Sequence, residues 1–241
     1  MRHFVNGKEG AGLPAGDLGV TRGVNVFETF RTYGRTPFGF AQHMARLRGS
    51  AAGFGIAVPD GLEDELLSYV EDDVVIRVML TAGGNRAVEI YPVPQERIGR
   101  PVTVAAVDFA PPLGFVKHGS RAFGIAMARQ HGVEEVLWTA DGLLLEGMRS
   151  NLIGVVGGQL VTPPADGRIL DGVTRRAMRQ VSPIREAPLR LQDCDELWLS
   201  STLKELAPAV VDGRSMAGPV GRGLHQRFRA ALPELLRTDA S

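Results

Sequence analysis

Residues 134–163 read EEVLWTADGLLLEGMRSNLIGVVGGQLVTP, and this stretch decides much of the fold. One pair of β-rich runs flanks Ala140-Asp141-Gly142, and a second pair flanks Gly157-Gly158. Asp-Gly and Gly-Gly pairs between apolar runs are typical of tight turns between antiparallel strands. The stretch therefore predicts two consecutive β-hairpins.

Helical and β-rich segments continue on both sides of these hairpins. Apolar residues at helical spacing predict helices over 41–54, 61–70, 120–131, 173–181 and 220–238. Alternating or β-rich runs predict strands over 3–6, 24–33, 74–82, 86–93, 102–109 and 196–202. Runs of strands with helices between them predict an α+β fold.

The chain is expected to form two domains. Pro111, Pro112 and Gly114 interrupt any regular element, which predicts an interdomain linker at 111–116. We therefore expect a small N-terminal α/β domain over residues 1–110 and a larger C-terminal domain over residues 117–241.

The composition is that of an ordinary globular protein. The chain has 241 residues and a mass of 25.9 kDa, with 44% apolar and 22% charged residues, which argues against a disordered chain or a fibre. A net charge of zero argues against a broad nucleic-acid surface. No apolar run reaches about 18 residues, so no membrane span is predicted. A single cysteine, Cys194, and no apolar leader at the start predict a cytoplasmic protein.

Lysine is rare in this chain: only Lys8, Lys117 and Lys204 are present. Lys117 lies in the apolar, glycine-rich run LGFVKHGS, residues 113–120. Desolvation in such a segment would lower the pKa of the amine and make it a nucleophile. The alternative is a linker lysine whose amine reaches solvent.

Two other segments place polar groups at the ends of predicted elements. Glu146 closes an apolar run, so it is either a buried acceptor or an edge charge paired with Arg149. Residues 170–175, LDGVTR, place backbone amides and the Thr174 hydroxyl at a helix start. Such a start favours an anion through the helix dipole and free N–H groups, although an ordinary N-cap has the same pattern.

The order of these motifs resembles the class IV aminotransferases, the fold-type IV enzymes related to D-amino acid aminotransferase that use pyridoxal 5′-phosphate. The shared pattern is Lys117, then Glu146-Gly147-x-x-Ser150-Asn151, then Leu170-x-Gly172-x-Thr174-Arg175. The matching stretches are residues 23–56, 116–164, 169–178 and 196–213. The resemblance implies the two-domain fold-type IV architecture and a C-terminal domain that binds the cofactor.

The resemblance also implies roles for single residues. Lys117 would hold the cofactor through a Schiff base and move protons on the substrate carbon. Glu146 would bind the pyridine nitrogen and keep it protonated. The phosphate would be held by residues from three segments: Arg46, Val173, Thr174 and Thr202. No metal is implied.

The chain departs from the family pattern near the lysine. Many members have Asn-Tyr a few residues after it, whereas this chain has Ser120-Arg121-Ala122. Lys117-His118-x-x-Arg121 is instead similar to aminodeoxychorismate lyases. A family Thr-Arg-Gly motif reads Thr81-Ala82-Gly83 here. The substrate carboxylate is therefore left to Arg31, Arg86 or Arg121.

The resemblance implies an enzyme of amino acid metabolism that works as a homodimer on a small amino-acid-like substrate. The first expectation is a 4-amino-4-deoxychorismate lyase that releases pyruvate and forms 4-aminobenzoate for folate biosynthesis. The alternative is an aminotransferase on branched-chain or D-amino acids with 2-oxoglutarate. A silent homologue that only binds a ligand is the third. No nucleic acid or membrane partner is expected.

Overall fold

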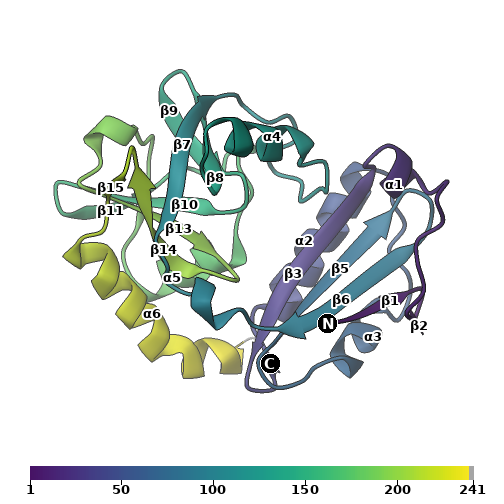
Figure 1. Ribbon diagram of the computed structural model, residues 1–241. Helices are drawn as coiled ribbons and strands as arrows, with labels where there is room; N and C mark the ends of the chain where they lie inside the picture. The colour runs from purple at the N-terminus through teal and green to yellow at the C-terminus, as the bar shows by residue number, and fades with distance from the viewer. Residues whose placement is uncertain (239–241) are drawn as a thin grey trace. The chain divides into compact units, whose positions relative to one another are not determined.

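A computed structural model describes residues 1–238 of the chain, which form two compact units (Figure 1). The first unit contains Met1–Val93, Val116–Ser120 and residues 235–238. The second contains Pro94–Phe115 and Arg121–Glu234. The sequence placed the boundary after residue 110, whereas the structure groups residues 94–110 with the second unit.

The first unit is built on a six-stranded antiparallel sheet with the strand order β2-β1-β6-β5-β3-β4. Its strands are β1 Arg2–Val5, β2 Lys8–Glu9, β3 Asn25–Tyr33, β4 Thr36–Pro37, β5 Val74–Thr81 and β6 Arg86–Pro92. The short β4 pairs only with Thr32 and Tyr33 at the end of β3. Along the first half of β3 the same edge is bridged by the segment 116–120, where His118 pairs with Val26.

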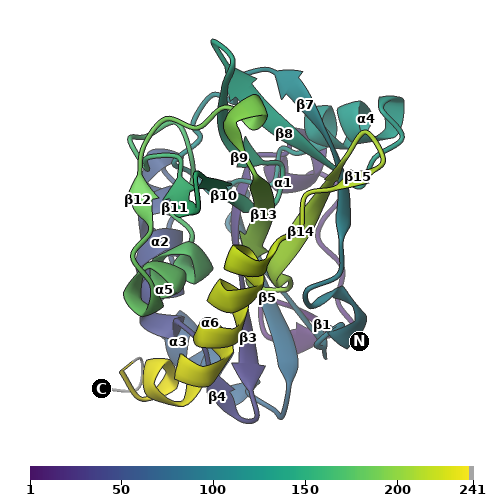
Figure 2. The same ribbon diagram turned by 90° about the vertical axis from the view of Figure 1, so that its left-hand side faces the viewer.

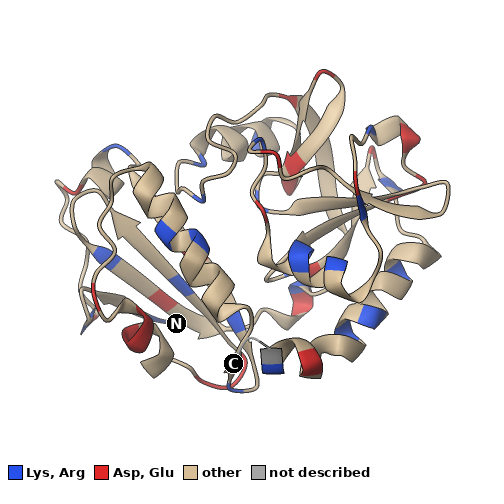
Figure 3. Cartoon of the chain, turned by 180° about the vertical axis from the view of Figure 1, so that it is seen from behind, with Lys and Arg blue, Asp and Glu red and all other residues tan. Residues whose placement is uncertain are grey.

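Helices cover one face of this sheet, and Figure 1 shows α2 lying along β3. The helices of the unit are α1 Leu18–Thr21, α2 Phe40–Gly53 and α3 Leu62–Ser68. Met44 and Leu47 of α2 share a buried apolar core with Val26 and Phe30 of β3. Figure 3 shows basic residues along α2 and acidic residues on α3. The apolar residues of α2 thus hold the helix against β3, and this packing also fixes the positions of the polar residues on the helix.

The second unit contains a nine-stranded mixed sheet. Eight of its strands follow the order β12-β11-β10-β13-β14-β7-β8-β9, and the ninth, β15, pairs with β14. Its strands are β7 Val102–Asp108, β8 Glu135–Ala140, β9 Leu143–Gly147, β10 Asn151–Val156, β11 Gln159–Thr162, β12 Arg185–Glu186, β13 Glu196–Ser201, β14 Glu205–Val211 and β15 Arg214–Ser215. β7 runs parallel to both β14 and β8. The strands share an apolar core that includes Leu137, Leu152 and Leu197.

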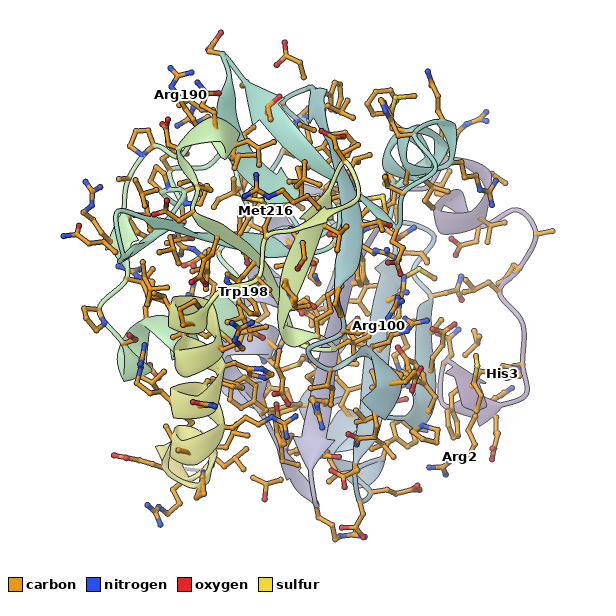
Figure 4. The ribbon with its side chains drawn as sticks, turned by 60° about the vertical axis from the view of Figure 1, so that its left-hand side comes forward. Arg2, His3, Arg100, Arg190, Trp198 and Met216 are labelled. Carbon is orange, nitrogen blue, oxygen red and sulfur yellow. The ribbon has the colours of Figure 1, made fainter. Side chains whose placement is uncertain are left out.

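Three α-helices and two 3₁₀ turns complete the second unit: α4 Ala122–Gln130, α5 Val173–Val181, α6 Pro219–Thr238, η1 Gln95–Arg97 and η2 Leu191–Asp193. α5 packs against β13, and both are visible in Figure 2. Glu196 caps the start of α6 by accepting the N–H groups of Val220 at 3.0 Å and Gly221 at 2.8 Å. Trp198 also donates to Glu196, at 2.9 Å, and lies beside α6 in Figure 4. Strand β13 is therefore packed against both α5 and α6.

The expected α+β class and the two hairpins are confirmed, and α5 has the expected bounds 173–181. Strand β14 and the single-turn helix α1 are not predicted from the sequence. β14 contains Pro208 and begins at Glu205 with a φ of 54°, both unusual in a strand. No helix within residues 1–238 is long and apolar enough to cross a membrane.

Candidate functional site

Lys117 belongs to the first unit, where its backbone is fixed from two sides. Its carbonyl accepts the N–H of Phe27 on β3 at 3.0 Å, and its own N–H donates to Ser50 Oγ on α2 at 3.1 Å. The side chain is half-buried, and Nζ lies 4.8 Å from the centroid of the Phe27 ring. A cation at this distance from an aromatic face is attracted by it. The amine is thus placed by a rigid backbone and an aromatic ring.

The Phe27 ring lies on the sheet face opposite α2, because its neighbour Val26 packs in the core under α2. Arg77 of β5 is on the same face, and its guanidinium carbon lies 4.6 Å from the Phe27 ring centroid. Arg31 of β3 is buried on that face too, 4.0 Å from the ring of Tyr33. The face that carries the Lys117 contact therefore also carries two arginines, of which Arg77 was not identified in the sequence.

The other two candidate arginines lie elsewhere. Arg86 is two residues from Val88 on β6, so both side chains point to the same face of the sheet, where Val88 packs in the core under α2. The Nε of Arg86 lies 2.5 Å from Glu65 on α3. Arg86 is therefore on the opposite face of the sheet from Phe27. Arg121 belongs to the second unit, where its Nη1 donates to the carbonyl of Met148.

Arg46 lies on α2 and forms a buried cluster with Glu28 of β3 and His43. Its Nε lies 2.6 Å from Glu28 Oε1 and its Nη2 lies 2.9 Å from Oε2. His43 Nδ1 is 2.8 Å from Glu28 Oε2, so this nitrogen carries the proton that bridges them. Glu28 and His43 are fully buried, whereas the Arg46 side chain is 12% exposed. The spacing of three residues puts His43 and Arg46 on one side of α2.

The charges in this cluster set its protonation. Burial alone would raise the pKa of Glu28, but the charge of Arg46 and the contact with His43 hold that pKa well below its ordinary value. Burial lowers the pKa of His43, and although Glu28 opposes this, the charges of Arg46 and Lys117 add to it. At neutral pH the cluster therefore holds an ionised Glu28, a neutral His43 and a cationic Arg46.

Glu146 closes β9 in the second unit and is held by two residues outside that strand. Its Oε2 accepts the N–H of Leu170 at 3.0 Å and the side-chain amide of Asn151 at 3.4 Å. Asn151 also donates to the carbonyl of Leu170 at 2.7 Å. The guanidinium of Arg149, the partner considered in the sequence, instead donates to the carbonyl of Glu134 at 2.7 Å and lies 3.9 Å from the Glu135 carboxylate. Glu146 is therefore a fixed, half-buried acceptor and not the partner of Arg149.

The start of α5 has the features of an anion site. The N-cap is Gly172, which has no side chain to cap the helix. It therefore makes no side-chain hydrogen bond to the first backbone N–H groups of the helix, those of Val173 and Thr174. A side chain at Gly172 would not fit, because its Cβ would lie 1.9 Å from Asn151 Oδ1. The dipole of α5 and these amides favour a negative charge at this end. Val173 and Thr174 are both buried.

The end of β13 adds hydroxyl groups in the same unit. Ser200 is buried, and its Oγ has no hydrogen-bond partner within the described residues. A buried polar group without a partner is costly and calls for a ligand or water to complete it. Thr202 follows in the turn after the strand and is half-buried. Thr202 was expected from the sequence, whereas Ser200 was not.

Neither the cysteine nor a group of metal-ligating side chains adds a reactive site among the described residues. Burial, together with Asp193 and Asp195, raises the pKa of the Cys194 thiol to about 12, which keeps it protonated and unreactive. Among residues 1–238 no three His, Cys, Asp or Glu side chains are grouped to hold a metal ion.

Known proteins resemble this chain in sequence and in fold. The amino-transferase class IV family pattern matches residues 25–210. A putative branched-chain-amino-acid aminotransferase of Methanocaldococcus jannaschii is 27% identical, over 95% of this chain and 96% of the relative. A D-alanine aminotransferase of Staphylococcus epidermidis is 25% identical, over 93% and 95%. A hypothetical aminotransferase of Mycobacterium tuberculosis, solved with α-ketoglutarate and PMP, has a TM-score of 0.80 at 25% identity, over 96% of this chain and 98% of that one.

Proposed function

Because this chain belongs to the class IV aminotransferases, which are pyridoxal 5′-phosphate enzymes, we propose that it transfers the amino group of a branched-chain or D-amino acid to 2-oxoglutarate. The observation that carries the proposal is that relatives named as aminotransferases of these two classes align over nearly the whole chain. The structural relative solved with α-ketoglutarate supports the choice of acceptor.

The residues present fit this cofactor. An anionic phosphate suits the uncapped start of α5 and the unpartnered Ser200 hydroxyl in the second unit. A pyridine nitrogen suits the fixed carboxylate of Glu146. An aldehyde needs a lysine, and the half-buried Lys117 has the backbone support that such a lysine requires. When bound, pyridoxal 5′-phosphate supplies an electron sink for the carbon whose proton is removed.

Each residue then has a defined task. Lys117 would hold the cofactor and, once free of it, would move the proton at the substrate Cα. Glu146 holds a proton on the pyridine nitrogen, as Leu170 and Asn151 fix its carboxylate. Val173, Thr174 and Thr202 hold the phosphate, and Arg46 supplies a planar cation for it. In this assignment Glu28 keeps the Arg46 guanidinium in one plane.

For the substrate carboxylate, the geometry favours Arg31, with Arg77 beside it, over Arg86. Arg31 and Arg77 share the sheet face of the Phe27 ring over which the Lys117 amine lies. Arg86 is engaged with Glu65 on the other face. Arg121 contacts the Met148 carbonyl, two residues after Glu146, which keeps it as a second candidate.

The lyase reaction remains the second candidate because of one sequence feature, Lys117-His118-x-x-Arg121. The named relatives support the aminotransferase better, since both classes among those described are aminotransferases. The two reactions share the lysine and the cofactor contacts and differ in what becomes of the substrate carbon skeleton.

The test offers purified enzyme a panel of L- and D-amino acids with 2-oxoglutarate and, separately, 4-amino-4-deoxychorismate. We expect glutamate to form with L-leucine, L-isoleucine and L-valine or with D-alanine, and no 4-aminobenzoate. Formation of L-glutamate would assign the enzyme to the branched-chain L-amino acids, and formation of D-glutamate would assign it to the D-amino acids. Release of 4-aminobenzoate without glutamate formation would establish the lyase and overturn the proposal.

We further propose that the protein works in the cytoplasm as a homodimer. The second unit supports the dimer with large apolar side chains that are exposed at Leu113, Phe115, Phe123 and Ile125. Sedimentation velocity should give twice the monomer mass of 25.9 kDa. A Phe115→Ser, Phe123→Ser variant should shift that equilibrium toward monomer, and an unchanged dimer would exclude this surface.

A further inference from the structure

A buried carboxylate, that of Glu135, lies in the second unit among residues to which the proposed function gives no role. Glu135 of β8 is fully buried. The ammonium of Lys204 lies 2.5 Å from Glu135 Oε2 and 2.8 Å from Ser150 Oγ. The Lys204 side chain is 14% exposed, so this ion pair is almost entirely removed from water.

Glu135 organises the turn that follows Glu146. Its Oε1 accepts the N–H of Arg149 at 2.7 Å, and its Oε2 accepts the hydroxyl of Ser150 at 3.3 Å. The turn is closed by the Gly147 N–H, which donates to the Ser150 carbonyl at 2.7 Å. A Cβ at Gly147 would lie 2.6 Å from Glu135 Oε1, so the carboxylate packs directly on the turn backbone.

Lys204 closes a different turn, the one that carries Thr202. Its N–H donates to the carbonyl and to the hydroxyl of Ser201, each at 3.3 Å. Its carbonyl accepts the N–H of Gly99 at 3.0 Å. One ion pair therefore joins the turn of Thr202, between β13 and β14, to the turn after Glu146, between β9 and β10.

A buried ion pair is weak evidence of a stabilising role, because the cost of desolvating both charges offsets much of their attraction. Its distinctive contribution is directional: the partners must stay within hydrogen-bond distance. Loops that carry ligand contacts need such support, since a displacement of about 1 Å weakens them.

We propose that Glu135 and Lys204 are positioning residues that fix the separation of Thr202 and Glu146, and with it the spacing between the phosphate contact and the ring-nitrogen contact of the cofactor. This rests on the proposed function, which assigns those two contacts. Neither Glu135 nor Lys204 touches the cofactor in this assignment, and both act through the turns that they hold.

The test uses pyridoxamine 5′-phosphate, which has an amine in place of the aldehyde and so binds without a covalent bond to Lys117. Its Kd is measured for the wild type and for Lys204→Met/Glu135→Gln, which removes both charges of the pair. The Arg149 guanidinium, whose Nε lies 3.9 Å from Glu135 Oε2, is half exposed and stays solvated in this variant. We expect the Kd to rise about tenfold, the lower end of losses seen when a group that orients a ligand's partners is removed.

A double-mutant comparison separates positioning from simple stability. Thr202→Val is introduced into both backgrounds, and the thermal midpoint of each apoprotein is recorded. If the ion pair positions Thr202, Thr202→Val raises the Kd in the wild type. In the Lys204→Met/Glu135→Gln background, called the paired variant, it then raises the Kd by less than about threefold. A Kd within twofold of wild type in the paired variant, or a fully additive effect of Thr202→Val, would overturn the proposal.

A matched control is the ion pair of Arg100 with Glu134, the residue before Glu135. This pair is exposed to solvent, and Arg100 is labelled in Figure 4. Arg100→Met/Glu134→Gln should leave the Kd unchanged, and an equal loss in this control would overturn the proposal. If Lys204→Met/Glu135→Gln does not fold, Lys204→Gln takes its place in the same comparison, because glutamine keeps a hydrogen-bond donor near Glu135 and Ser150.

The outcome also separates this inference from the proposed function. If the wild type neither binds pyridoxamine 5′-phosphate nor forms glutamate, the proposed function fails and this inference falls with it. If the wild type does both and the paired variant binds equally well, only the positioning role is contradicted.

Discussion

Glu28 in the first unit and Glu135 in the second are both fully buried carboxylates, but their surroundings differ. Glu28 lies on β3, and its partners His43 and Arg46 are three residues apart on α2. Glu135 lies on β8, and its partners Arg149, Ser150 and Lys204 belong to turns.

The difference indicates two ways of using a buried charge. On regular elements, the carboxylate orients a neighbouring cation, Arg46, whose position the packing of α2 already fixes. Among turns, the carboxylate itself supplies the contacts that define the loop. Substitution at Glu28 should therefore strand a cation in a rigid environment, whereas substitution at Glu135 should loosen a loop that can relax.

The largest expected effect comes from Glu28→Gln. It removes the charge that balances a nearly buried Arg46, and the rigid β3–α2 contact allows little relaxation. We expect the free energy of unfolding to fall by about 3–5 kcal/mol, the range for breaking a buried pair. Urea unfolding of the apoprotein measures it. Glu135→Gln, tested beside it, should cost less, and a larger loss at Glu135 would reverse the comparison.

Glu146 is the carboxylate to which we assign the chemistry. Glu146→Gln keeps the shape and loses the charge that holds a proton on the pyridine nitrogen. We expect turnover to fall at least about 100-fold, the order of a positioned catalytic group, while the cofactor stays bound. Steady-state kinetics and the cofactor content after gel filtration measure this. Near-normal turnover would remove Glu146 from the ring nitrogen.

Part of this arrangement could be predicted from the sequence, and the reasons are local. α5 was predicted with its bounds because its apolar period, Gly172 and the residues that end it are contiguous. Arg46 and His43 could be placed on one helix for the same reason. Their partner Glu28 could not be identified, because a contact between strand and helix over 15 residues leaves no periodic signal.

The Glu135–Lys204 pair is still harder to predict, since 69 residues separate the partners. The partners meet because β7 pairs with β14, which follows the turn of Lys204, and with β8, which carries Glu135. Strand β14 is not predicted, because Pro208 and the positive φ of Glu205 argue against a strand. The roles assigned to Lys117, Glu146, Thr174 and Thr202 from family resemblance stay predictions.

The next effect compares two residues to which we assign the phosphate, Arg46 and Thr202. Arg46→Lys keeps the charge beside Glu28 but loses the planar fork, whereas Thr202→Val loses one neutral hydrogen bond. A charge-assisted contact contributes about 1.5–3 kcal/mol and a neutral one about 0.5–1.5 kcal/mol. Lysine offers only one of the two parallel donors of the guanidinium, so Arg46→Lys should lose one charge-assisted contact. We therefore expect lower cofactor retention in Arg46→Lys than in Thr202→Val on dialysis with substrate amine. Equal retention in Arg46→Lys and wild type would remove Arg46 from the site.

The smallest effect concerns a third buried carboxylate, Glu205. Burial would raise its pKa, but the hydrogen bond from His225 and the charge of Arg229 on α6 hold it below the ordinary value of 4.5. Because the pKa is lower in the folded state, this stabilisation is present above about pH 4.5 and is lost as the pH falls through the lowered value.

Arg229 is half exposed, so we expect the contribution to be about 1 kcal/mol or less. Glu205→Gln should reduce the stability at neutral pH and flatten its decline in acid. Urea midpoints at neutral and acid pH measure both changes. An unchanged acid slope would show that other carboxylates set it.

Reduction of the cofactor-loaded enzyme with borohydride shows directly whether Lys117 is the lysine that bonds the cofactor. Reduction makes the bond permanent, and peptide mapping then identifies the labelled residue. The account predicts the label on Lys117 and its loss in Lys117→Ala. Lys204 should carry none, because its amine is paired with Glu135. A label on Lys204 or Lys8 in the wild type would contradict the account.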